Sequence, residues 1–242
     1  MKKIILYGLL TLLPCSCAQA QWHFFGIIQD TDGYVNIRDT DKSVIDKLFD
    51  NHVFFDWDAR TDEPDADWHN IEYGAETGIT KCNDKNTKTG EIHKSRIRYL
   101  EDLPQLKKQS QSTDECLVYA NDTLTVELRI RDFNPHGHKV VQGSQWLEIQ
   151  SIDGVSDLWG VDNRMPRKEY ASISIKHPEG TLNFPVEYFS HLYEPGDNIL
   201  VSLGKGNAIF ICTLNGDASY GYCAVWTVEN YLVKSLFVLL GF

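Results

Sequence analysis

The sequence has few basic residues, no long apolar run after its first twenty residues, and no long stretch with helical periodicity. Its 23 lysines and arginines stand against 34 acidic residues, a net charge of −11. This net field does not attract nucleic-acid phosphates or anionic lipid surfaces, so we expect no nucleic-acid partner. No later segment approaches the roughly 20 apolar residues of a membrane span. The aromatic content of 12% and the missing helical periodicity favour a mainly β fold.

The amino terminus has the pattern of a secretory signal peptide over residues 1–20. A basic pair at positions 2 and 3 precedes an apolar run of about ten residues, and small residues follow at positions 18–20. We therefore predict export to the periplasm or the extracellular space. A lipoprotein attached through Cys15 or Cys17 is the less favoured alternative, because both match a lipobox poorly. Cleavage removes two of the 23 basic residues and leaves 21 against 34 acidic ones, a net charge of −13.

Four cysteines follow the predicted cleavage site: Cys82, Cys116, Cys212 and Cys223. In an oxidising compartment this even number indicates disulfides. The stretch IFICTLNGDASYGYCAVW holds two apolar runs around a turn-rich segment, which predicts a hairpin. Folded symmetrically about residues 217–218, it places Cys212 opposite Cys223, near disulfide range. We predict a Cys212–Cys223 bridge, with buried free thiols as the alternative, and Cys82–Cys116 as the remaining pair.

Short alternating segments separated by polar turns fill residues 21–100. The stretch DTDGYVNIRDT begins with a turn rich in carboxylates and glycine. In the strand that follows, Val35 and Ile37 point one way, and Asn36 and Arg38 the other. Further strands are expected near residues 53–57, 68–74 and 90–97. Several short strands at close spacing predict a small β barrel.

The two ends of this region resemble bacterial SH3-type domains. DTDGYVNIRDTDKSVIDKL is similar to their G-Y-V-N-[VI]-R opening with a following V-I-x-x-L. GEIHKSRI is similar to the G-Y-I-H-K-S-R-I closing strand of versions found in exported envelope proteins. Residues 39–41 replace the usual G-P-[GS] loop, Glu91 stands where a tyrosine is common, and residues 58–67 form an acidic insertion. The resemblance implies an SH3-like barrel, but no particular ligand.

Aromatic residues are the best candidates for ligand contact in this region. SH3-type grooves are lined with aromatic rings and suit extended peptides or glycan-linked peptides. Most rings of the region are expected in the core. We assign Tyr34, Trp57 and Trp68 as candidates for the groove, with Tyr34 and Trp57 as first choices.

The polar residues 101–113 predict a linker, and residues 114–242 predict a second, antiparallel β domain. Alternation over residues 124–130 indicates a strand with its apolar side chains at even positions. Residues 185–195 predict one short helix, because a proline suits its first turn, apolar residues share a face and a second proline ends it. This half resembles an uncharacterised envelope-associated β domain through SIDG, LWGVDNRMP, LNFPVEYFSHLYEP and NGDASYGYCAVW. That family has no agreed activity to carry over.

The resemblance brings loops of the second region together and with them four aspartates: Asp153, Asp157, Asp162 and Asp217. They are a candidate cation or sugar site, against ordinary turn and cap roles. The pair His136 and His138 and the acidic run 56–67 lack the ordered frames of zinc and calcium sites. We therefore expect no metal and no cofactor.

Catalysis has weaker support than binding. SH3-type domains often precede wall-cutting cysteine peptidases, and such an enzyme needs an activated cysteine near a histidine. Cys116 leads into a strand pattern instead of a helix start. We predict a non-catalytic exported protein that binds a peptide, a peptidoglycan component or an envelope protein. The alternatives are a cell-wall hydrolase or accessory enzyme with an unrecognised site, and a purely structural partner of an envelope protein.

Overall fold

The computed structural model describes residues 24–60, 67–81, 86–143, 149–162, 164–216 and 220–240. This described part is mainly β, with 56% strand and 8% helix, and none of its helices reaches seven residues. The prediction of a mainly β fold with antiparallel sheets is therefore confirmed.

A seven-stranded antiparallel sheet forms most of the amino-terminal region, in the order β3-β2-β7-β5-β4-β1-β8. Its strands are β1 (Phe25–Ile28), β2 (Tyr34–Arg38), β3 (Val44–Phe49), β4 (Val53–Asp56), β5 (Trp68–Tyr73), β7 (Lys88–His93) and β8 (Ile97–Tyr99). In β2, Val35 and Ile37 are buried and their neighbours are partly accessible, as the period-two pattern predicts. One apolar cluster, which includes Ile37, Phe54 and Ile71, forms the core beside this sheet.

The carboxyl-terminal region consists of two five-stranded sheets and a small two-stranded one. The first sheet contains β16 (Asn198–Leu203), β17 (Ile209–Asn215), β18 (Tyr222–Glu229), β19 (Leu232–Leu240) and β6 (Gly78–Lys81). The second contains β15 (Gly180–Asn183), β14 (Lys168–His177), β11 (Thr125–Asp132), β10 (Cys116–Ala120) and β9 (Lys107–Lys108). The two-stranded sheet is β12 (Val140–Gln142) with β13 (Ile149–Ile152).

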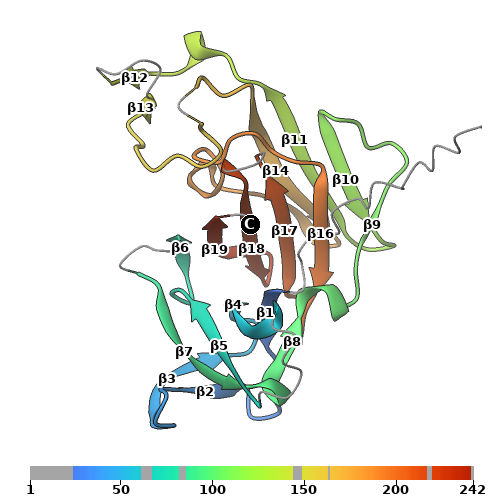
Figure 1. The fold of residues 1–242 in the computed structure, drawn as a ribbon. Coiled ribbons are helices and arrows are strands. Elements are labelled where there is room, and N and C mark those ends of the chain that lie inside the picture. The colour runs from blue at the N-terminus through green and yellow to red at the C-terminus, as the bar shows by residue number, and fades with distance from the viewer. Residues whose placement is uncertain are drawn as a thin grey trace, which may run out of the picture.

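The sheet of β16–β19 is the central layer of the molecule, between the amino-terminal strands and the sheet of β10, β11 and β14 (Figure 1). Ile209 and Ile211 pack into a core shared with Val126 of β11. Phe210, on the opposite face, packs into a core shared with Phe25 of β1. Because both faces are covered, β17 and β18 read as nearly continuous apolar runs. Each large side chain buried this way contributes about 1.5–3 kcal/mol of transfer free energy.

The two regions of the chain share a sheet as well as a core. β6 leaves the amino-terminal region and pairs in parallel with β19, from Gly78 opposite Ser235 to Lys81 opposite Val238. Residues 101–113, expected as a linker, contain β9 and the buried Leu106, whose N–H donates to the Val201 carbonyl at 2.9 Å. The chain between the regions is therefore hydrogen-bonded to the central sheet.

The helix predicted over residues 185–195 is wrong in extent. Only a single 3-10 turn, Val186–Tyr188, forms there. Beyond it the backbone bonds to neighbouring segments, since the Tyr193 N–H donates to the Trp159 carbonyl at 2.9 Å and Glu169 bridges to Tyr193. These tertiary bonds replace the ones that a longer helix would make within itself.

The predicted Cys212–Cys223 bridge is wrong. The register pairs Cys212 with Val225 and Cys223 with Leu214, two positions away from the symmetric alignment. Such diagonal neighbours lie about 7–8 Å apart, whereas a disulfide needs Cα atoms within about 6.8 Å. Cys212 is a buried free cysteine, and burial, with the neighbouring Cys223, raises the pKa of its thiol.

The second predicted bridge, Cys82–Cys116, is not formed either. Cys116 is a free cysteine at the start of β10, and Cys82 lies outside the described residues. The described part of the chain is thus held by apolar packing and strand pairing, without a disulfide.

Candidate functional site

A groove of about 420 Å³ opens between β2 and the end of β7. These strands pair only at Arg38 opposite Glu91, so they separate toward the start of β2. The strand β5 and the turn after β7 form the opposite wall. The lining residues are Asp30, Asp32, Tyr34, Val35, Asn36, Arg38, Trp68, His93, Ser95 and Arg96.

Two of the three predicted aromatic residues, Tyr34 and Trp68, line this groove. The Lys47 ammonium lies 3.7 Å from the centre of the Tyr34 ring, and the Lys42 ammonium lies 4.7 Å from that of Trp68. His93 meets the Trp68 ring edge to face, with 5.4 Å between ring centres. Cations placed over aromatic faces are attracted by the ring quadrupole. The groove therefore combines aromatic surface with positive charge.

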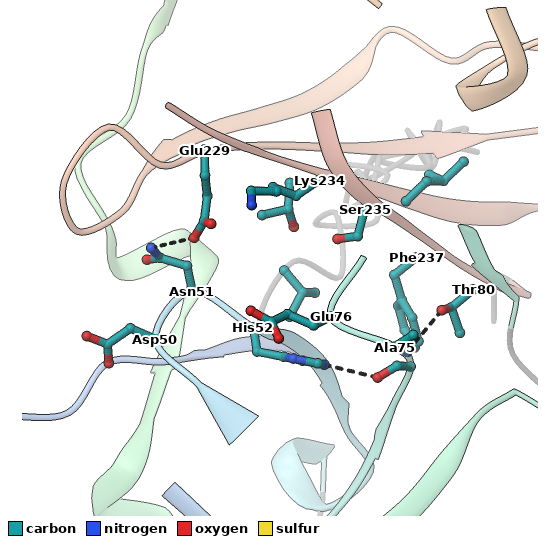
Figure 2. Close-up of a pocket in the computed structure, with 14 residues that line it drawn as sticks. Asp50, Asn51, His52, Ala75, Glu76, Thr80, Glu229, Lys234, Ser235 and Phe237 are labelled. Atoms are coloured by element: carbon teal, nitrogen blue, oxygen red, sulfur yellow. Dashed lines mark hydrogen bonds between the residues drawn. The ribbon is translucent and has the colours of Figure 1, made fainter. Parts of the chain in front are cut away.

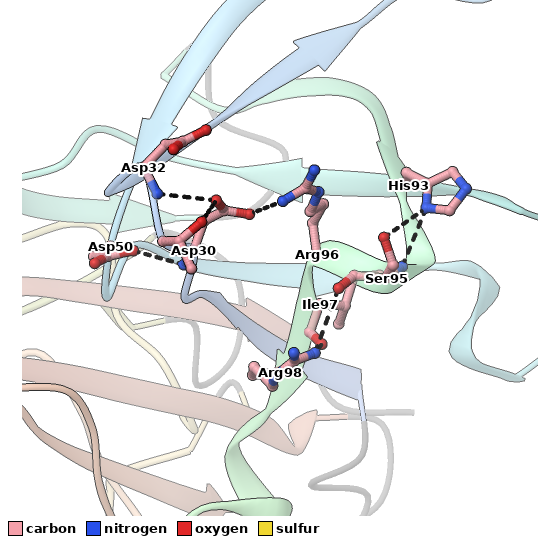
Figure 3. Close-up of polar contacts among 9 residues, drawn as sticks. Asp30, Asp32, Asp50, His93, Ser95, Arg96, Ile97 and Arg98 are labelled. Carbon is pink, nitrogen blue, oxygen red and sulfur yellow. Dashed lines mark hydrogen bonds and ion pairs between the residues drawn. The ribbon is translucent and has the colours of Figure 1, made fainter.

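Asp30 organises the end of the groove near the start of β2 (Figure 3). Its carboxylate accepts the Asp32 backbone N–H at 3.1 Å and pairs with Arg96. The backbone bond first, and then the guanidinium, hold the pKa of the Asp30 carboxyl below its usual range. The same turn ends at Gly33, whose φ of +77° is one that glycine adopts without strain. The predicted turn before β2 thus positions one wall of the groove.

Arg38 lies at the other end of the groove. Its guanidinium donates to the Lys42 carbonyl at 2.6 Å and lies 5.9 Å from the centre of the Trp68 ring. Lys42 pairs with Glu91, the residue directly across from Arg38. No carboxylate of the described residues lies within ion-pair distance of Arg38. This guanidinium therefore keeps donors available for an anionic group.

Trp57, a first choice from the sequence, does not line the groove. It follows β4, its side chain is 42% exposed, and its ring meets Phe55 edge to face at 4.8 Å. Its indole N–H donates to the Glu72 carboxylate at 3.2 Å. It lies beside the 3-10 turn Asp58–Arg60, away from the residues that line the groove.

The predicted aspartates of the second region have separate partners. Asp153 accepts from His138 at 2.7 Å, Asp157 pairs with Lys81 of β6, and Asp162 pairs with Arg164 at 3.0 Å. Asp217 lies outside the described residues. Among the residues that the structure describes, no group of three His, Cys, Asp or Glu side chains is placed to hold a metal ion.

His138 links two elements of the second region. Its other ring nitrogen lies 3.2 Å from the Glu169 carboxylate, and its ring stacks on Phe133 with 4.7 Å between centres. Partial burial disfavours the charged ring, but the hydrogen bond that the ring donates to Asp153 and the charge of Glu169 raise the pKa of His138. With both ring nitrogens engaged by carboxylates, this histidine holds the start of the β12 segment against β14.

A small polar cavity of about 20 Å³ lies between the two regions and has no signal in the sequence (Figure 2). His52 and Gly74 line it from the amino-terminal side, and Thr80, Thr227 and Ser235 from the central sheet. The hydroxyl of Thr227 is buried with no hydrogen-bond partner in the described residues. A cavity of this size holds about one water molecule. Its walls are far apart in sequence, so no local pattern could indicate it.

His52 is the titratable group of this cavity. Its Nε2 lies 3.1 Å from the Gly74 carbonyl, and its ring meets Tyr73 edge to face. Burial lowers the pKa of His52 to about 4, so the ring is neutral near pH 7. The contact between the regions therefore includes a histidine that resists protonation.

Sequence reasoning missed most polar residues of the groove. Asp30, Arg38, His93 and Arg96 all fall within the segments DTDGYVNIRDT and GEIHKSRI. Their position in those segments was the signal that could have identified them. The prediction considered only aromatic residues. It therefore included Trp57, which lies outside the groove, and omitted these four polar side chains.

Comparisons with protein-family models, with curated proteins and with solved structures found no match to this chain. Across the described ranges, no helix has both the length and the apolar character needed to cross a membrane.

Proposed function

We propose that this chain is a non-catalytic, exported binding protein of the cell envelope. In this proposal residues 21–100 form an SH3-like barrel whose groove binds an extended peptide of peptidoglycan or of another envelope protein. Residues 114–242 act as a scaffold or as a further recognition surface. The signal-peptide pattern of residues 1–20 supports the export step.

The groove is the observation that carries the proposal. Its walls come from Tyr34–Arg38 and from residues 93–96, which belong to the two segments that resemble SH3-type domains. A concave surface with aromatic rings and a few placed polar groups suits a peptide ligand. Four other cavities in the described residues are each lined by at most one Phe, Tyr or Trp ring.

Retention on insoluble peptidoglycan tests the proposal. The mature full-length chain is incubated with purified sacculi, and the bound fraction is measured after sedimentation over a range of concentrations. We expect retention, and a roughly tenfold weaker affinity for Trp68→Ala, as for an aromatic anchor of an interface. Trp57→Ala is the matched control, because this tryptophan lies outside the groove.

Three results would overturn this assignment or part of it. Absence of retention, together with absence of binding to extracted envelope proteins, would remove the binding function. Clearing of a peptidoglycan zymogram by the wild type, lost in Cys116→Ala, would establish a cell-wall hydrolase instead. Equal losses for Trp68→Ala and Trp57→Ala would remove the groove as the binding site.

A further inference from the structure

The edge of β2 that faces the groove is unpaired. On one side β2 pairs with β3 along its whole length, from Tyr34 opposite Phe49 to Arg38 opposite Val44. On the other side it meets β7 only at Arg38 opposite Glu91. In the described part of the chain, the edge from Tyr34 to Ile37 therefore has no strand beside it.

The ladder with β3 indicates which backbone groups this edge offers. The Asp50 N–H donates to the Gly33 carbonyl at 3.0 Å, so Gly33 bonds toward the β3 side. Residues in an antiparallel pair alternate between bonding to the partner and bonding away from it. The N–H and C=O groups of Tyr34 and Asn36 consequently face the groove. An unpaired edge of this kind is a template for another strand.

The charge at one end of this edge indicates the kind of peptide. Arg38 keeps guanidinium donors free of any carboxylate in the described residues, and its planar fork suits bidentate binding of a carboxylate. At the opposite end, the exposed Asp32 carboxylate makes no hydrogen bond or ion pair with described residues, so it suits a cationic group. The unpaired edge that lies between these two side chains, from Tyr34 to Ile37, is four residues long at roughly 3.3 Å each.

We propose that the groove binds the carboxyl-terminal tail of another protein by strand addition, parallel to β2, with the terminal carboxylate at Arg38 and a basic residue about four positions earlier at Asp32. Trp68 and His93 contact the side chains of the tail from the opposite wall. This inference rests on the groove of the proposed function and specifies its ligand. Regular backbone pairing between strands requires α-linked residues of a single chirality. A protein tail therefore fits this edge better than a branched peptidoglycan peptide does.

Peptide pools test this inference with the mature full-length chain. The probe is a fluorescein-labelled hexapeptide pool with a lysine four positions before a free carboxyl terminus, compared by fluorescence anisotropy with the same pool as carboxyl-terminal amides. We expect the free acids to bind at least tenfold tighter. A third pool with N-methyl groups at alternate backbone positions should lose binding, because strand pairing needs those N–H groups.

The variants locate the carboxylate. Arg38→Gln should abolish the difference between acid and amide pools, and Arg38→Lys should restore part of it. Arg129→Gln, an exposed arginine of β11 outside the groove, should leave the difference unchanged. Hydrogen exchange of the Tyr34 and Asn36 amides should slow when the acid pool is bound. The peptide comparisons do not depend on any variant, so they stand even if Arg38→Gln folds poorly.

Three outcomes would overturn the inference: equal binding of acid and amide pools, unchanged selectivity in Arg38→Gln, or tight binding of N-methylated peptides. If none of the pools binds but sacculi retain the protein through Trp68, the inference fails and the proposed function remains. If sacculi and extracted envelope proteins are not retained and the pools do not bind, both fail.

Discussion

The amino-terminal sheet and the central sheet use their side chains differently. In β17 and β18 almost every residue is buried, and both faces are covered by other parts of the chain. In β2 only Val35 and Ile37 are buried, and the alternate residues line a groove. In β17 and β18 both faces pack against other parts of the chain. In β2 one face packs in the core, and the other is accessible to a ligand. Recognition should therefore depend on the alternating strands, and stability on the apolar ones.

Alanine variants of two tryptophans, one buried in the central sheet and one exposed in the amino-terminal region, should have the largest difference in stability. Trp226 of β18 is fully buried, and its indole N–H donates to the Tyr188 carbonyl at 2.8 Å. We expect Trp226→Ala to lower the free energy of unfolding by about 3–5 kcal/mol, because it creates a large cavity. Trp57→Ala, at a side chain 42% exposed, should cost less than about 1 kcal/mol. Urea denaturation followed by circular dichroism measures both, and similar losses would contradict the comparison.

Acid should weaken both regions through one buried histidine in each. Burial lowers the pKa of His52 and of His191 to about 4, against 6.5 in the unfolded chain. The unfolded state then binds more protons between these values, so stability is lost as the pH falls from about 6.5 to about 4. Each histidine contributes a loss of roughly 3 kcal/mol across that window.

Single variants separate the two contributions. The unfolding free energy is measured at pH 7 and at pH 4.5. The difference between the two values should be smaller in His52→Gln than in the wild type, and likewise smaller in His191→Gln. A pH dependence that neither variant changes would show that other groups cause it. A change in His52→Gln alone would place the acid sensitivity at the contact between the regions.

The smallest expected effect concerns the polar rim of that contact. Lys205 pairs with Asp50, but the lysine side chain is half exposed to solvent. Exposed ion pairs contribute about 0–1 kcal/mol, so Lys205→Gln should change the unfolding free energy by less than 1 kcal/mol. A larger loss at low salt, removed by added salt, would show that charge and not apolar packing joins the regions.

The elements with strong local patterns were predictable from the sequence. Alternation identified the buried face of β2, and the apolar runs around a turn identified the β17–β18 hairpin. In β11, Val126, Leu128 and Ile130 are buried at the even positions that the pattern indicates. Each of these features depends on residues close together in the chain.

Register and long-range pairing were not predictable. Placing Cys212 opposite Cys223 assumed a turn centred on residues 217–218, and a shift of two positions removed the disulfide. The parallel pairing of β6 with β19 joins residues more than 150 positions apart and has no local signal. For the groove, the aromatic residues Tyr34 and Trp68 were identified, but the charged ends at Arg38 and Asp32 depend on how β2 and β7 diverge.

The pairing of β6 with β19 also constrains the order in which the protein can mature. β6 (Gly78–Lys81) comes more than 150 residues before its partner β19 (Leu232–Leu240) in the chain, so it is synthesised well before that partner. The amino-terminal region cannot complete its contacts until β19 has been synthesised. A fragment that stops at residue 100 would leave the apolar side chains of Phe25 and Phe55 uncovered. Such fragments should aggregate during production, so ligand screens need a chain that includes both regions.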